Sequence, residues 1–335
     1  MRKFSSYKVV FIILICGCCV DPFNTSLSVN KTLVVDGLLT DQHGPHTITL
    51  SYSSDLGVGA TMRELASGAS VSILDGTGVQ TPLTEVSQGA YQTDSSFQAQ
   101  EGKSYFIRIS LNSQSYESEV ETLLPAGQLD SLYFKIQSTP LANQFQFYAN
   151  SGKVQQSNGL MRWRSSFIFQ ILTWPQLSED PPPCSNPCTC CTCWVYGHNN
   201  DVVVGSGSNF IDNKFNNNLV ASIPIDDQRF QIRYYLTVDQ LSLSTSAYNF
   251  WNLVVSQKAG AGSLFQPASA RVQGNIHSTT NPNEQVLGLF QVSSVVSKSI
   301  FINRSDVPYN MRHDPPFLNM TDCRGQGTNI RPSFW

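Results

Sequence analysis

The stretch Tyr105-Phe-Ile-Arg-Ile-Ser-Leu111 decides the fold class of this 335-residue chain. Its residues alternate between one set, Tyr105, Ile107, Ile109 and Leu111, and another, Phe106, Arg108 and Ser110. Successive side chains of a β-strand point to opposite faces, so this alternation predicts a strand with the first set against a core.

Similar short stretches lie on both sides of this strand. We expect further strands at Leu33–Gly37, Thr47–Tyr52, Ala69–Leu74, Gly89–Thr93 and Tyr116–Thr122. Turn residues separate them at intervals of about ten residues, which is typical of a β-sandwich. The order of Gly68–Asp75, Gly89-Ala-Tyr91 and Gly102-Lys-Ser-Tyr105 also resembles that of small transthyretin-like domains. We therefore predict an immunoglobulin/transthyretin-like β-sandwich over residues 32–124.

Residues 125–335 are predicted to form a second, β-rich domain. Leu124-Pro-Ala-Gly127 has the Pro and Gly of a domain joint. Beyond it the pattern predicts strands at Leu129–Ile136, Gln144–Ala149, Leu160–Trp174 and Arg229–Asp239. The stretch Asn199–Asn218 is rich in Asn, Gly and Ser, and we expect a loop there.

One amphipathic helix is expected in this second domain. Ser244 or Thr245 is suited to cap its start, and Gly260 and Gly262 to end it. Its apolar side consists of Ala247, Tyr248, Phe250, Trp251, Val254 and Val255. Such a helix packs on a neighbouring sheet, and the alternative is a helix that binds a partner.

The N-terminus predicts export and a lipid anchor. Arg2, Lys3 and Lys8 precede the apolar run Val9–Ile15, which is too short to span a bilayer. The run leads into Ile15-Cys-Gly-Cys18, which resembles the bacterial lipobox. We expect residues 1–17 to be a lipoprotein signal peptide, Cys18 to carry diacylglycerol and a further acyl chain such as palmitate, and residues 18–31 to be a tether. The alternative is an ordinary cleaved secretory signal.

A cysteine cluster is the most unusual local feature. Six cysteines remain after Cys16, Cys18 and Cys19 are set aside: Cys184, Cys188, Cys190, Cys191, Cys193 and Cys323. Disulfides are typical of exported proteins, so we predict a stapled loop with Cys323 tying the C-terminal segment to it. The connectivity stays open. A thiolate site for Cu(I) or Zn and a set of free thiols are the alternatives.

Composition and motifs argue against several classes of function. Only 13% of residues are charged and the formal net charge is -3, so nucleic-acid binding is not expected. The sequence contains no HExxH, P-loop or Gly-x-Ser-x-Gly motif. We therefore predict a non-enzymatic protein without a cofactor or a metal site. Most Trp residues are expected in the core, although some could stack on a glycan.

Several motifs occur in one order along the chain. They are Cys18 followed by Asp21-Pro-Phe23, Leu33–Gly37, Met161-Arg-Trp-Arg164, Tyr248-Asn-Phe-Trp251, Gly274-Asn-Ile276, Asn281-Pro-Asn-Glu284 and the closing Asp322–Trp335. In this arrangement the chain resembles the Bacteroidota outer-membrane lipoproteins known as domain of unknown function 4249. The resemblance implies an envelope lipoprotein associated with TonB-dependent receptors. It implies no reaction or ligand.

These observations lead to one expected function and two alternatives. We expect a lipid-anchored protein of the cell outer membrane, on either its surface or its periplasmic face, that binds as an accessory subunit of a TonB-dependent receptor. The first alternative is a glycan-binding or glycan-active surface lipoprotein. The second is a protein that handles metal through its cysteine loop.

Overall fold

The computed structural model describes residues 31–53, 64–140, 142–152, 159–178, 188–208, 210–260, 272–312 and 320–335. Thr32–Trp335 form one compact unit. The predicted signal peptide, the lipidated Cys18 and nearly all of the tether lie outside the described residues. Within the described ranges, no helix is both long and apolar enough to cross a membrane.

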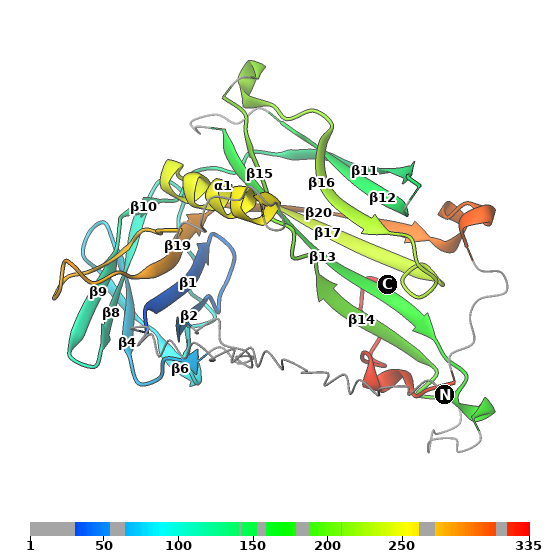
Figure 1. Ribbon diagram of the computed structural model, residues 1–335, viewed down its shortest axis with the longest axis horizontal. Helices are drawn as coiled ribbons and strands as arrows, with labels where there is room; N and C mark the ends of the chain where they lie inside the picture. The colour runs from blue at the N-terminus through cyan, green and yellow to red at the C-terminus, as the bar shows by residue number, and fades with distance from the viewer. Residues whose placement is uncertain are drawn as a thin grey trace, which may run out of the picture. The chain divides into compact units, whose positions relative to one another are not determined.

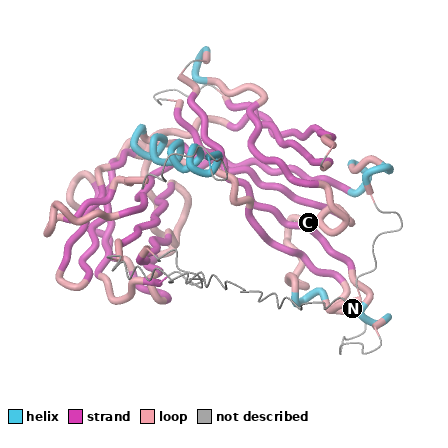
Figure 2. Tube along the Cα trace, viewed as in Figure 1, coloured by secondary structure: helices cyan, strands magenta, loops and turns pink. Residues whose placement is uncertain are grey.

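The fold class is mainly β, as predicted, and it begins with a sandwich of two sheets (Figures 1 and 2). The first sheet has the order β19(Leu287–Ser293), β1(Leu33–Thr40), β2(Thr47–Tyr52), β7(Ala90–Gln92) and β6(Thr84–Ser87), with β3(Glu64–Leu65) beside β2. The second has the order β18(Ile276–Ser278), β9(Gln114–Ser118), β8(Ser104–Leu111), β4(Ser70–Asp75) and β5(Gln80–Pro82), with β10(Glu121–Thr122) beside β8.

The alternation in β8 has the predicted effect. Its residues Tyr105, Ile107, Ile109 and Leu111 are all buried in the core of the sandwich. Arg108 on the other face is exposed and donates to Glu117 of β9 at 2.7 Å. Burying one face and solvating the other is the standard solution for an antiparallel sheet.

The sandwich includes two strands from far along the chain. β18 pairs antiparallel with β9, and β19 pairs parallel with β1. The predicted limits 32–124 therefore leave out two strands of this sandwich, and the predicted second domain 125–335 contains them. The physical reason is that Val286, Phe290 and Val292 need an apolar face, and the sandwich core buries all three.

The second β-rich region also consists of two sheets. One has the order β11(Leu129–Ser138), β12(Asn143–Ser151) and β16(Asn218–Pro224). The other has the order β14(Thr192–His198), β13(Leu160–Leu172), β17(Arg233–Ser242) and β20(Val295–Asn303), with β15(Val203–Ser206) beside β13. Their shared core includes Phe145 and Phe147 of the first sheet and Trp163 and Leu236 of the second.

The predicted helix is α1(Thr245–Gly260), and Ser244 caps it by accepting from the backbone N–H of Ala247 at 3.0 Å. It lies next to β13, β15 and β19 (Figure 1), which agrees with a helix packed on sheets. The loop predicted for Asn199–Asn218 is wrong in part, because β15 pairs there with β13. Short 3-10 helices lie at η1(Pro175–Leu177), η2(Ile211–Asn213), η3(Arg304–Asp306), η4(Tyr309–Met311) and η5(Cys323–Gly325).

Candidate functional site

A pocket of about 430 Å³ lies where β1, β13, β19 and α1 meet. Its apolar wall includes Val34 and Leu38 of β1, Phe250, Trp251 and Val254 of α1, and Leu289 of β19. Its polar wall consists of Asp36, Arg162, Arg164 and Gln291. The pocket thus joins the first sandwich to the β-rich region, and we call it the Arg162 pocket.

Arg162 is held in this pocket by stacking. Its guanidinium carbon lies 3.5 Å from the centroid of the Trp251 ring. The indole N–H of Trp251 donates to the Gln291 side chain at 2.7 Å, which fixes the ring over β19. A guanidinium on an indole face gains cation–π attraction and loses rotational freedom. The stack therefore holds the guanidinium of Arg162 in one orientation.

The charge of Arg162 is only partly balanced by the protein around it, because Asp36 of the pocket acts on it without forming an ion pair. Its Nε atom is buried and has no hydrogen-bond acceptor, and no carboxylate of the described residues forms an ion pair with it. Burial, followed by repulsion from Arg164, lowers the pKa of Arg162 to about 10, while Asp36 acts in the opposite direction. The side chain is still cationic at neutral pH. A partly buried cation that forms no ion pair favours an anionic ligand.

Arg164 contributes differently. It follows Arg162 by two positions on β13, so both side chains lie on the same face of the strand. One of its terminal nitrogens lies 3.3 Å from Asp239 of β17. Arg164 therefore has an ion-pair partner, whereas Arg162 forms no ion pair with a carboxylate of the described residues. With the apolar wall beside it, the site suits a small organic anion.

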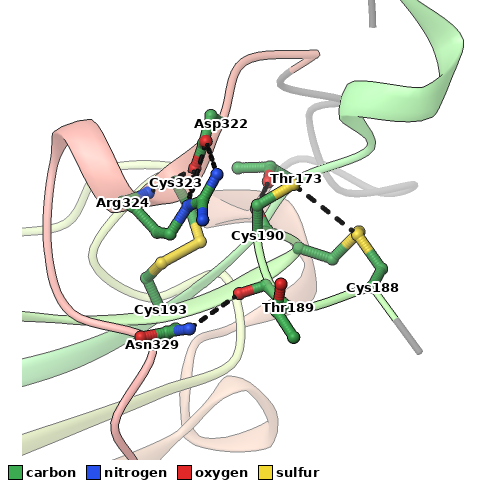
Figure 3. Close-up of polar contacts among 10 residues, drawn as sticks. Thr173, Cys188, Thr189, Cys190, Cys193, Asp322, Cys323, Arg324 and Asn329 are labelled. Carbon is green, nitrogen blue, oxygen red and sulfur yellow. Dashed lines mark hydrogen bonds and ion pairs between the residues drawn. A yellow bond between two sulfur atoms is a disulfide. The ribbon is translucent and has the colours of Figure 1, made fainter. Parts of the chain in front are cut away.

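The cysteine cluster contains disulfides, which confirms the prediction of disulfide bonds. Cys188 is bonded to Cys191. Cys193 of β14 is bonded to Cys323 of η5 (Figure 3). Cys190 is also disulfide-bonded. The remaining predicted member, Cys184, lies outside the described residues, as does the lipidation candidate Cys18.

Backbone contacts add to the link between the cysteine loop and the C-terminal segment. The N–H of Cys323 donates to the carbonyl of Cys190 at 3.2 Å, and the Asn329 amide donates to the carbonyl of Thr189 at 3.1 Å (Figure 3). Thr173 also donates to the Cys190 carbonyl, at 3.1 Å. The cluster therefore has a structural role, which is to link the cysteine loop to the C-terminal segment. The geometry of its described residues indicates no further chemistry.

The cysteine cluster and the Arg162 pocket are separate sites, and sequence reasoning identified only the first. Met161-Arg-Trp-Arg164 stands out in the sequence as a motif, but nothing in its spacing predicts that either arginine binds a ligand. Trp251 was expected in the core, whereas the structure places it, partly buried, in the wall of the pocket. The available signal was a pair of arginines flanking the buried Trp163 on a central strand.

Fold and site together define a mainly β, disulfide-stapled protein with a cationic pocket beside its helix. The chain belongs to the family described as Domain of unknown function (DUF4249), whose model matches residues 20–299. No curated protein matches the chain. Among solved structures it is similar to the two fibronectin type-III domain segment from chicken tenascin, with 11% identity, coverage of 64% of this chain and 91% of that chain, and a TM-score of 0.18. At that score the likeness supports no conclusion.

Proposed function

We propose that this protein is a non-enzymatic binding protein of the outer membrane, which holds a small organic anion and serves a TonB-dependent receptor as an accessory subunit. The observation that carries the proposal is the stacked Arg162, whose Nε has no acceptor among the described residues, in a pocket of about 430 Å³. The lipobox-like sequence before Cys18 supports the membrane anchor. The family resemblance supports the receptor.

Ligand binding is tested on the full mature protein in detergent. A panel of small carboxylates is screened by thermal shift and measured by calorimetry. Arg162→Gln should weaken the binding of any hit at least about tenfold, because a charged hydrogen bond contributes about 1.5–3 kcal/mol. The matched control is Arg108→Gln, since Arg108 lies on an exposed strand face with Glu117. An equal effect of both variants would reject the pocket as the site.

The anchor is tested separately. Metabolic labelling with a palmitate analogue should mark the wild-type protein and leave Cys18→Ala unlabelled. Several acyl chains on one residue give stable anchoring, because each buried methylene contributes about 0.8 kcal/mol. Labelling that survives in Cys18→Ala would show that Cys18 is not the lipidated residue.

The partner is tested by affinity purification of the tagged lipoprotein from solubilised outer membranes. Recovery of a TonB-dependent receptor in amounts close to those of the bait supports the proposal. Recovery of no receptor, together with binding to a glycan array, would favour the first alternative.

The two alternatives differ in their support. Glycan binding is favoured by a separate group of aromatic side chains around Trp194 and Trp335. Metal handling is not favoured, because the sulfurs of Cys188, Cys191, Cys193 and Cys323 are engaged in disulfides. Cu(I) and Zn sites use thiolates, which disulfide sulfurs do not provide.

A further inference from the structure

A second cavity, also of about 430 Å³, lies on the β-rich region away from the residues of the Arg162 pocket. The side chains that matter for its chemistry are Gln170, Trp194, Arg233, Asn303, Arg331 and Trp335. They come from β13, β14, β17, β20 and the C-terminal segment, so residues far apart in the sequence form one wall. We call it the Trp335 cavity.

The C-terminal segment is fastened against this cavity. The disulfide from Cys193 to Cys323 holds its start. Further on, Trp194 and Thr328 exchange two backbone hydrogen bonds, at 2.8 and 3.0 Å. At its end, the indole N–H of Trp335 donates to the Gln170 side chain at 3.1 Å. The cavity is therefore a built feature of the fold.

The polar groups of the cavity that lack partners are donors. Trp194 is 7% exposed, and its indole N–H has no acceptor among the described residues. The Gln170 and Asn303 oxygens accept from Trp335 and Arg233, at 3.1 and 3.0 Å, which leaves their amide N–H groups for a ligand. A buried donor without an acceptor is costly, so this wall favours a ligand rich in acceptors.

The charge of the cavity favours an anionic ligand. Arg331 donates to the main-chain oxygen of Trp335 and is thereby engaged. Arg233 donates its Nε–H to Asn303 and forms no ion pair with a carboxylate of the described residues. The lining contains no Asp or Glu. The guanidinium of Arg233, which also lies 5.0 Å from the centroid of the Phe301 ring, can bind a carboxylate through two hydrogen bonds.

The non-polar part of the wall is aromatic. Trp335 packs edge to face with Trp194 at a centroid distance of 6.3 Å and with Phe301 at 5.5 Å. Ile232 is the aliphatic member of the lining. Rigid indole rings among hydrogen-bond donors suit a small ring that has apolar faces and hydroxyls on its rim, whereas a long acyl chain would require an aliphatic wall.

We propose that the Trp335 cavity binds a sugar that carries a carboxylate, with the carboxylate on Arg233, the hydroxyls on the donors of Trp194, Gln170 and Asn303, and the ring against Trp335. This site is independent of the anion bound in the Arg162 pocket. It gives the glycan-binding alternative a defined place and a chemical class of ligand.

The test is calorimetry on the full mature protein in detergent with D-galacturonate and D-glucuronate. D-galactose, D-glucose and inorganic phosphate are titrated in parallel. We expect at least one of the two acids to bind at least about tenfold tighter than its neutral counterpart and than phosphate, because a charge-assisted bidentate contact is lost in the others. Absence of binding, equal affinity for acid and neutral sugars, or a preference for phosphate would each overturn the proposal.

Variants locate the site. Arg233→Gln should weaken binding of the acid at least about tenfold and Arg233→Lys by less, while the exposed control Arg108→Gln should leave it unchanged. Trp194→Phe keeps a ring but removes the indole N–H, and should also weaken binding. Unchanged circular dichroism shows that each variant is folded. Loss of binding in Arg108→Gln, or full binding in Arg233→Gln, would show that the acid binds elsewhere.

Discussion

The guanidinium of Arg162 in β13 stacks on the indole of Trp251 in α1, with 3.5 Å between the guanidinium carbon and the ring centroid. The same indole donates to Gln291 of β19 at 2.7 Å. One side chain of the helix therefore links a central strand of the β-rich region to the edge strand of the first sandwich. The stack also positions the cation of the Arg162 pocket.

Trp251→Leu should lower the free energy of unfolding by about 2–3 kcal/mol, because it removes a partly desolvated cation–π contact and a hydrogen bond. Trp251→Phe keeps an aromatic face and should lose only about 1 kcal/mol, from the missing N–H donor. Urea denaturation of the two variants measures the difference. Equal losses would mean that the stack contributes nothing to stability.

Glu121→Gln should change the pH dependence of stability. Glu121 is 2% exposed, accepts from Asn275 at 3.1 Å, and has a second oxygen without a partner. Burial raises its pKa above the ordinary 4.5, whereas hydrogen bonds from Ser244 and Asn275 oppose the rise and nearby Glu119 adds to it. The folded state therefore keeps a proton that the unfolded state has already lost.

It follows that this carboxyl makes wild-type stability fall as the pH rises from about 4.5 through the raised pKa, because the folded state binds more protons there. Glu121→Gln cannot titrate, so its stability should be less dependent on pH in this range and higher than wild type at pH 7. Chemical denaturation at several pH values measures both. Glu117→Gln, on a partly exposed strand face, is the control, and parallel curves for wild type and Glu121→Gln would contradict the prediction.

The disulfides Cys193–Cys323 and Cys188–Cys191 should differ in their contribution to the free energy of unfolding. Cys193 and Cys323 are separated by 130 positions, so Cys193→Ala with Cys323→Ala should lose about 5 kcal/mol in the chain-entropy model. Cys188 and Cys191 are separated by 3 positions, and the matching double variant should lose about 2 kcal/mol. Thermal and chemical denaturation under non-reducing conditions compare them. Equal losses would show that loop length does not determine the effect.

Gly288→Ala tests the parallel pairing of β19 with β1. Gly288 has φ of +100°, and a Cβ atom there would lie 1.8 Å from the carbonyl oxygen of Val35. We expect a loss of about 3 kcal/mol or more, from strain and disrupted pairing. Gly78→Ala is the control, because Gly78 has φ of +89° with no atom within 4 Å of the added Cβ, so only about 1 kcal/mol of strain is expected.

Hydrogen exchange gives a second measurement of the same pairing. The Phe290 amide donates to the Asn275 side chain at 2.9 Å, so its protection reports on β19 directly. Gly288→Ala should accelerate exchange there, and Gly78→Ala should leave it unchanged. Unchanged protection in both variants would contradict the role of Gly288.

Local patterns predicted most strands and the helix. The alternation in Tyr105–Leu111 and the Ser244 cap each depend on neighbouring residues, so a single segment contains the information. Gly274-Asn-Ile276 was recognised only as a motif. In the structure, a Cβ on Gly274 would lie 1.3 Å from the Gly288 carbonyl oxygen, and Asn275 bonds to Phe290 and Glu121. The motif therefore helps β18 and β19 to pack within the first sandwich.

The sequence by itself determined the mainly β fold class, the helix and the presence of disulfides, because periodicity and short motifs report on local structure. It also predicts a lipid on Cys18. Only the tertiary structure placed Arg162 on Trp251 and Arg233 beside Trp335. Both arrangements join residues from distant strands, and their partners are selected by packing of the sheets. Neither the hydrophobic periodicity nor the motif spacing of the sequence indicates how the sheets pack. The two pockets can therefore be identified only from the folded structure.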